Sequence, residues 1–133
     1  MSANLKPIFP LIPVCNVATI TAANTLRTGG GTIVDLVTGD ADGTRIDQII
    51  VQALVTTTAG MVRFFVHDGS AYHLCYEQLV PATTASGSAV AFRAEILRND
   101  GRGWMILPSG HKIGVATDKA EEFRVIALGG DYS

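Results

Sequence analysis

The chain has 133 residues, of which 47% are hydrophobic and only 17% are charged, and its formal net charge is −2. This length suits one domain with one core, and the ten Lys and Arg residues are scattered singly, so we expect no direct contact with nucleic acid. An average soluble domain carries about 25% charged residues. Two interpretations fit the shortage of charge: a compact sandwich whose surface is rich in Thr, Ser and Gly, or a surface that is largely covered by other subunits. We favour the second, because obligate interfaces resemble a protein core.

Residues 1–13 are predicted to form an extended arm, and residues 14–133 a single β-sandwich domain. The arm has prolines at every third position, which fall on one side of a polyproline helix. Its large apolar residues occupy the other sides, and they are Ile8, Phe9, Leu11 and Ile12. Such an arm is poorly solvated on its own, so we expect it to lie either on its own sheet or on a neighbouring subunit.

The N-terminus has some features of a signal peptide, because Lys6 precedes an apolar run. Pro7, Pro10 and Pro13 interrupt the helix that the apolar region of a signal would form. No apolar stretch approaches the roughly 20 residues that a membrane-spanning helix needs. We therefore expect synthesis in the cytoplasm without processing, and no contact with a membrane.

Two β-prone runs follow the arm, at residues 14–22 and at residues 32–38, which are rich in β-branched side chains. The glycine run 29–31 between them lacks the Gly-Lys-Ser/Thr ending of a phosphate-binding loop, so it is predicted to be a flexible loop. Asp40 and Asp42 have the Asp-x-Asp spacing of a calcium site but no late glutamate ligand. A turn is expected there instead, since Asp and Gly favour turns.

Residues 44–57 are predicted to form a long strand with apolar residues on both faces. Such a strand either is buried on both faces or carries a β-bulge that changes which residues point inward. One of its faces is a candidate subunit contact, represented by Ile50 and Leu54.

Residues 60–80 are predicted to form a β-hairpin around Asp68-Gly69. A loop of residues 68–70 would pair Val66 with Tyr72, Phe64 with Leu74 and Val62 with Tyr76. In that register these six side chains face the core, including the two tyrosines. The other side would carry Arg63, His67, His73 and Glu77.

Further strands are predicted at residues 89–97, 104–107, 111–117 and 122–128, after a polar loop at 81–88. Eight or nine strands with turns at short intervals, and no helical periodicity of useful length, predict an all-β fold. We expect a single-domain antiparallel β-sandwich, jelly-roll-like, with an extended N-terminal arm.

Several residue groups suggest chemistry, but none has the required arrangement. His67, Asp68 and Ser70 are the residue types of a hydrolase triad, yet close neighbours in a hairpin cannot easily converge on one base. Cys75 with His73 and His67 shares a face in the predicted register but matches no zinc spacing. Consecutive strand carboxylates, Glu121 and Glu122, point in opposite directions, unlike a glycosidase pair. Cys15 and Cys75 are expected to be reduced.

Three segments, GTRIDQIIVQALV (43–55), TTTAGMVRFFVHDGS (56–70) and FRVIALGGDYS (123–133), occur in this order. They resemble segments of small virion structural proteins of tailed bacteriophages, and the likeness covers most of the chain after Thr32. The resemblance implies a non-enzymatic protein of the capsid decoration or cement type, made in the host cytoplasm and located on the capsid surface. The family defines no active-site residues, so no catalytic, cofactor or metal site is expected.

The expected partners are copies of the chain itself and the major capsid protein. A ring of identical contacts satisfies closed symmetry, and we expect a homotrimer. The candidate contact residues are Ile8, Phe9, Leu11, Ile12, Ile50, Leu54 and Trp104. The alternative is a carbohydrate- or receptor-binding module of a head fibre or tail, whose surface would be Trp104 with the loops 81–88 and 98–103.

Overall fold

The computed structural model describes residues 9–97 and 105–133, and residues 1–8 and 98–104 lie outside the described part. The described residues form strands and connecting loops, with no helix long and apolar enough to cross a membrane. The strands are β1 (Ile12–Ile20), β2 (Val34–Thr38), β3 (Thr44–Ala53), β4 (Gly60–His67), β5 (Tyr72–Val80), β6 (Arg93–Leu97), β7 (Met105–Leu107), β8 (Lys112–Thr117) and β9 (Phe123–Asp131).

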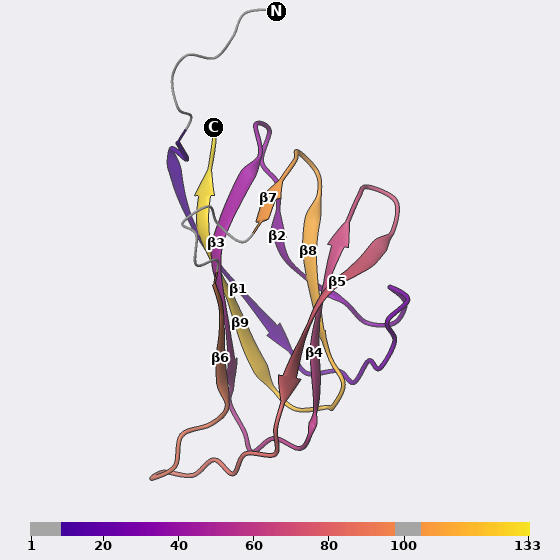
Figure 1. Ribbon diagram of the computed structural model, residues 1–133, viewed down its shortest axis with the longest axis vertical. Coiled ribbons are helices and arrows are strands. Elements are labelled where there is room, and N and C mark those ends of the chain that lie inside the picture. The colour runs from indigo at the N-terminus through magenta and orange to yellow at the C-terminus, as the bar shows by residue number, and fades with distance from the viewer. Residues whose placement is uncertain (1–8, 98–104) are drawn as a thin grey trace, which may run out of the picture.

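The strands form two antiparallel sheets that lie face to face, sheet A on the left of Figure 1 and sheet B on the right. Sheet A has the order β1-β9-β3-β6, with β7 also paired to β3, and sheet B has the order β2-β8-β4-β5. The prediction of an all-β antiparallel sandwich is therefore confirmed. The order is compatible with a jelly roll if β6 and β7, which pair with successive parts of β3, count as one interrupted strand.

The sandwich begins and ends at slightly different residues from those predicted. Strand β1 already starts at Ile12, so Ile12 and Pro13 belong to the sheet rather than to the arm. Strand β9 continues to Asp131, beyond its predicted end at residue 128, because its last residues pair with both β1 and β3.

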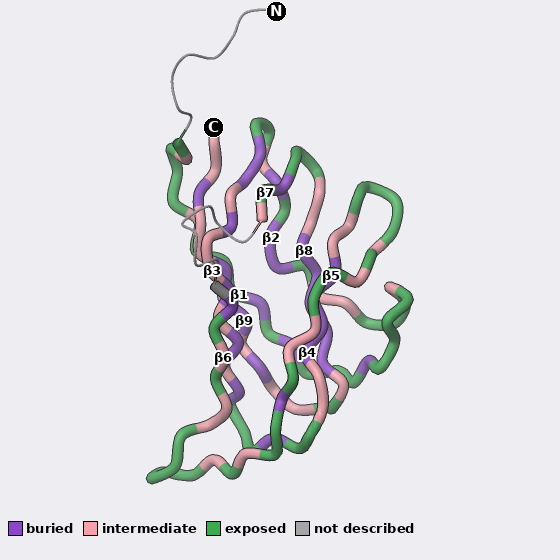
Figure 2. Tube along the Cα trace, in the orientation of Figure 1, coloured by how far each residue is buried: buried purple, intermediate pink, exposed green. Residues whose placement is uncertain are grey.

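The core lies between the sheets and consists of aliphatic and aromatic side chains from both. Figure 2 shows buried segments along the strands and exposed ones at the loops. The fully buried large apolar residues are Phe64, Phe65, Phe123, Ile46, Ile49, Leu107, Ile113, Val51, Val62, Val115 and Val125. Of these, all but Phe65 form the central cluster. Burying a side chain of this size contributes about 1.5–3 kcal/mol, so this layer holds the sheets together.

Strand β3 has apolar residues at positions that would point to both faces of a regular strand, although only one face of its sheet packs on the core. Its pairing with β9 shifts between Ile46 and Gln48, which confirms the predicted alternative of a β-bulge. The shift places Ile46, Ile49 and Val51 inward, where all three are buried, and leaves Ile50 on the opposite face. The strand ends at Ala53, so Leu54 lies beyond it rather than within it.

The predicted hairpin is confirmed as β4 and β5, but its predicted register is wrong. The structure pairs His67 with Tyr72, Phe65 with Leu74 and Phe64 with Tyr76, with a shift between Phe64 and Phe65 that leaves Cys75 as an extra residue. The loop contains four residues, 68–71, because the Asp68 carboxylate accepts hydrogen bonds from the backbone N–H groups of Ser70 (2.9 Å) and Ala71 (3.0 Å).

The corrected register turns Tyr72 away from the core, whereas Tyr76 keeps its predicted inward direction but is not buried. Tyr72 lies opposite His67 on the outer face of sheet B, with its ring 6.5 Å from that of Phe65, and its hydroxyl donates to Asp35. Tyr76 lies opposite Phe64 and faces inward, but β5 is an edge strand and the tyrosine remains exposed. The exposure of the two tyrosines therefore depends on the face to which each points and on their place in an edge strand.

Candidate functional site

Sheet A has one face toward the core and another, here called the outer face of sheet A, turned away from it. Alternation along each strand assigns the side chains, because the buried residues of β1, β9, β3 and β6 mark the inward set. The outward set, as far as the structure describes side chains, is Pro13, Cys15, Val17, Thr19, Arg124, Ile126, Leu128, Arg45, Gln48, Ile50, Gln52, Arg93, Glu95 and, on β7, Ile106, which is 59% exposed.

The centre of this outer face is an apolar row that crosses three strands. Val17 of β1 lies directly opposite Ile126 of β9, which lies opposite Ile50 of β3. The next row places Cys15 opposite Leu128. Directly opposed side chains are about 4.5–5.5 Å apart, so these residues touch across the strands. Val17 is nevertheless 58% exposed, while at one end of the face Pro10 of the arm lies against Gly130.

Charged residues lie around the apolar row, and each is paired with a charged residue nearby in the sequence. Arg93 binds Glu95 at 2.6 Å, and Arg124 binds Glu122 at 2.8 Å. Near the other end of the face, Arg45 of β3 binds Asp47 at 2.7 Å. Each pair is separated by two residues and carries one charge of each sign. The rim of the outer face of sheet A is therefore electrically balanced.

The end of the arm forms a second apolar surface. Phe9 is 65% exposed and Leu11 is 74% exposed, and Ile12 is also exposed. The backbone N–H of Leu11 donates to the carbonyl oxygen of Asp131 at 2.7 Å, which continues the pairing of β1 with β9 by one residue. The arm end is thus fixed in position while its side chains stay open to a partner.

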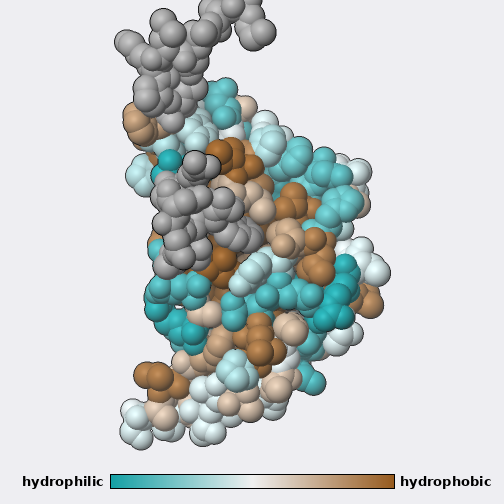
Figure 3. Space-filling view, in the orientation of Figure 1, coloured by the Kyte–Doolittle hydropathy of each residue, from teal (hydrophilic) through white to brown (hydrophobic). Residues whose placement is uncertain are grey.

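A third apolar area lies at the opposite end of the sandwich. Leu54 and Val55 are exposed just beyond β3, and Leu54 lines a shallow depression with residues 85–91. In Figure 3, which has sheet A on the left and sheet B on the right, brown patches are separated by teal and white ones. The apolar surface is thus divided into distinct areas.

The predicted contact residues fall into these three areas and do not form one site. Phe9, Leu11 and Ile12 lie at the arm end, Ile50 at the centre of the outer face of sheet A, and Leu54 at the far end. Ile8 and Trp104 lie outside the described residues, as do the loop residues 98–103 of the glycan-binding alternative.

The sequence analysis missed Val17, Ile126 and Leu128 as members of a surface. The signal was present, because alternation within their own strands already placed Val17 and Ile126 opposite the inward set. The sequence did not reveal the strand order β1-β9-β3, which brings these three residues onto one surface.

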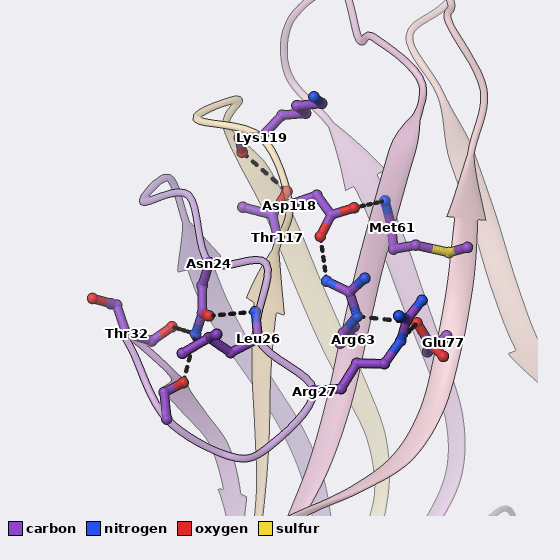
Figure 4. A network of polar contacts seen from close by, with 11 residues as sticks. Asn24, Leu26, Arg27, Thr32, Met61, Arg63, Glu77, Thr117, Asp118 and Lys119 are labelled. Carbon is purple, nitrogen blue, oxygen red and sulfur yellow. Dashed lines mark hydrogen bonds and ion pairs between the residues drawn. The ribbon is translucent and has the colours of Figure 1, made fainter.

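The outer face of sheet B is different, because a polar network anchors the connector of residues 21–33 across it (Figure 4). Arg63 is only 4% exposed, and its guanidinium binds Asp118 and, at 3.0 Å, Glu77. Arg27 of the connector binds the same Glu77 oxygen at 2.9 Å. The hydrogen bond from Arg27, followed by that from Arg63, lowers the pKa of Glu77. Asp118 also accepts the Met61 N–H at 3.1 Å.

Asn24 fixes the other part of the connector. Its side-chain amide donates to the carbonyl oxygens of Gly30 (3.0 Å) and Thr32 (2.9 Å), and its carbonyl oxygen accepts the Leu26 N–H at 3.1 Å. Its backbone N–H donates to Thr117 at 2.8 Å. The glycine run that was predicted to be a flexible loop therefore closes around a buried asparagine, and Gly31 takes a φ of 75° beside it.

The residues considered for a triad build the hairpin loop instead. The Asp68 carboxylate accepts from the Ser70 hydroxyl at 3.0 Å and contacts the His73 ring at 2.9 Å, while His67 Nδ1 accepts the Gly69 N–H at 3.1 Å. Hydrogen bonds from the N–H groups of Ala71 and Ser70, and then from His73, hold the pKa of Asp68 well below its usual range. The serine thus bonds the carboxylate and not a histidine, which is not the order of a catalytic triad.

The other ionisable candidates are also separated. His67 points to the outer face of sheet B and His73 to the inner face, so their predicted shared face is wrong. The Cys75 thiol donates to the Phe64 carbonyl oxygen at 3.3 Å, and burial raises its pKa to about 11. Within residues 9–97 and 105–133, no group of three His, Cys, Asp or Glu side chains is placed to hold a metal ion.

The two adjacent glutamates also have different partners. Glu121 accepts from the backbone and hydroxyl of Thr58 at 2.9 and 2.6 Å, whereas Glu122 pairs with Arg124. The two cysteines, Cys15 and Cys75, are free thiols in different sheets.

No family model, curated protein or solved structure matches the chain. The fold and the three apolar areas are therefore the observations from which a function is inferred.

Proposed function

We propose that the protein is a non-enzymatic structural subunit of a bacteriophage virion. In this role it is a capsid decoration or cement protein, which forms a homotrimer and binds the major capsid protein on the outside of the head. The observation that carries the proposal is the arm end, where consecutive large apolar side chains stand exposed on a backbone held by β9. The resemblance of three segments to phage virion proteins supports the same role.

The arm end has the physical properties of a docking element. Burying Phe9, Leu11 and Ile12 on a partner would contribute on the order of 3–5 kcal/mol, before the cost of ordering the partner groups is subtracted. That is a weak contact for one copy. A decoration protein binds in many copies, however, and each copy that binds only the assembled capsid shifts the equilibrium toward that form. Capsid stabilisation follows without any reaction.

The test uses particles of the phage that encodes the chain, prepared with and without its gene. Purified full-length protein is added to the particles that lack it, and binding is measured by co-sedimentation and cryo-electron microscopy. We expect saturable binding on the head surface and a higher temperature for genome release. Purified wild-type particles that contain no copies of the chain would contradict the proposal.

A matched pair of variants tests the arm. The double variant Phe9→Ser with Leu11→Ser should bind the particles at least about tenfold more weakly, because about 1.4 kcal/mol corresponds to a factor of ten. The control Leu79→Ser removes an equally exposed apolar side chain from the outer face of sheet B and should bind like the wild type. Equal binding by all three proteins would exclude the arm end as the capsid contact.

A further inference from the structure

We infer that the outer face of sheet A is the surface through which copies of this chain bind one another, with the same face of each copy turned toward a common symmetry axis. This inference rests on the proposed function for the existence of an oligomer, and it assigns the face that forms it. The arm end then remains free for the capsid.

The first argument compares the outer faces of the two sheets. On sheet B, the connector of residues 21–33 reaches across to Glu77 of β5 and helps to bury Arg63. On sheet A, no described element plays that part, and Val17 is left open at the end of the apolar row with Ile126 and Ile50. Within the part of the chain that the structure describes, the connector covers Arg63 on the outer face of sheet B, whereas the apolar row of sheet A has no such cover.

The second argument is the charge of the rim, which decides what kind of partner fits. The three pairs Arg93–Glu95, Arg124–Glu122 and Arg45–Asp47 place three positive and three negative groups around the apolar row, each already bound to its neighbour. A strongly charged partner would gain little from such a surface. A copy of the same surface meets no net repulsion from these three pairs, because the described charges of the rim sum to zero. Electrostatic balance of this kind suits self-association.

The third argument is size and shape. Strands β1, β9 and β3 are nine or ten residues long and β6 is five, so at a spacing of about 4.8 Å and a rise of about 3.3 Å per residue they cover a flat footprint of roughly 500 Å². The accessible surface of side chains on such a footprint is larger, and it approaches the ~800 Å² per partner of a standard stable interface. The central residues are β-branched or aliphatic on a pleated surface, which is the composition that packs sheet on sheet.

The strand order indicates where the symmetry axis of the oligomer passes. The middle of the outer face of sheet A lies between β9 and β3, at Ile126 and Ile50. A symmetry axis that passes near this point brings Ile126 of one copy close to Ile126 of the next. The same holds for a twofold or a threefold axis, because a residue that lies near a rotation axis lies near its symmetry copies in either case.

The first experiment is a crosslink in the full-length chain. Cys15→Ser and Cys75→Ser provide a background without thiols, and Ile126→Cys is added to it. Oxidation should convert at least half of this protein to a covalent dimer on a non-reducing gel. The control Leu79→Cys in the same background, which places a more exposed thiol on sheet B, should stay monomeric on the gel. The reverse pattern would overturn the inference.

The second experiment measures mass by light scattering at micromolar concentration. Val17→Asp should convert the wild-type oligomer to a monomer with an unchanged circular dichroism spectrum, because this side chain is not part of the core. Leu79→Asp should leave the oligomer intact. An oligomer that survives Val17→Asp overturns the assignment of the face. Particle binding is measured separately with the arm variants, so the proposed function can fail or hold independently.

Discussion

The buried guanidinium of Arg63 offers the sharpest test of how this sandwich is stabilised. In the structure its side chain is 4% exposed and binds Asp118, whose side chain is 16% exposed, together with Glu77, which is 28% exposed. The variant Arg63→Met keeps much of the side-chain volume but removes the charge. It leaves Asp118 as a mostly buried carboxylate without its cation.

The magnitude follows from the burial of the partners. Removing one member of a fully buried ion pair costs about 3–5 kcal/mol. Glu77 is more exposed and retains Arg27, so its share of the loss is small. We therefore expect Arg63→Met to lower the free energy of unfolding by about 2–4 kcal/mol, which is a large part of the 5–15 kcal/mol of a typical domain.

Urea denaturation measures this loss, with Arg124→Met as the matched control. Arg124 also binds a glutamate, Glu122, two positions away in the sequence, but both side chains of that pair are 40% exposed, so its loss should be below about 1 kcal/mol. A double-mutant cycle with Asp118→Asn should give a coupling of about 1–3 kcal/mol. If Arg63→Met costs no more than Arg124→Met, the reasoning from burial is wrong.

Three further perturbations test other parts of the structure. Asn24→Ala should cost about 1–3 kcal/mol, because it removes the three hydrogen bonds that this buried side chain makes with the backbone of the connector, whereas Asn16→Ala, which removes one bond to Leu36, should cost under about 1 kcal/mol in the same denaturation assay. Gly31→Ala should cost about 1–3 kcal/mol, since its φ is 75° and an added Cβ would lie 2.7 Å from the side-chain amide of Asn24, while Gly87→Ala has open space and should be neutral. The pKa of Asp68 is lower in the folded than in the unfolded chain, so its stabilisation is complete above the unfolded pKa of about 3.9 and is lost as the pH falls through the folded value. Thermal melts should therefore show a flatter acid dependence for Asp68→Asn, and an unchanged slope would refute this role.

The all-β class could be predicted because strand alternation is a local property of the sequence. Val62 and Phe64, and also Phe123 and Val125, alternate with polar or outward residues, and the structure buries all four. The bulge in β3 was also predictable. A strand with apolar residues on both faces either is buried on both faces or contains a β-bulge that changes which residues point inward.

The register of the hairpin could not be predicted from alternation alone. It depends on the Asp68 carboxylate, which draws Ala71 into the loop, and on Cys75 as an extra residue in β5. The predicted and observed registers differ in which side chains of β5 face the core, because the observed register turns Tyr72 outward. The hydrogen bonds of one side chain decide between them.

The outer face of sheet A and the Arg63 network required the tertiary structure. Val17 and Ile50 are far apart in the sequence, and only β9 between their strands joins them in one row. Arg63 looked like a solvated position, because its burial comes from a connector that precedes it by about thirty residues. Surfaces of this kind depend on strand order, which no local pattern specifies.

The central claim is that the subunit completes its burial against copies of itself. Light scattering of the purified wild-type chain across micromolar concentrations tests this most directly. The account predicts a constant mass three times the 14.0 kDa of one chain. A mass of 14.0 kDa at every concentration would contradict it.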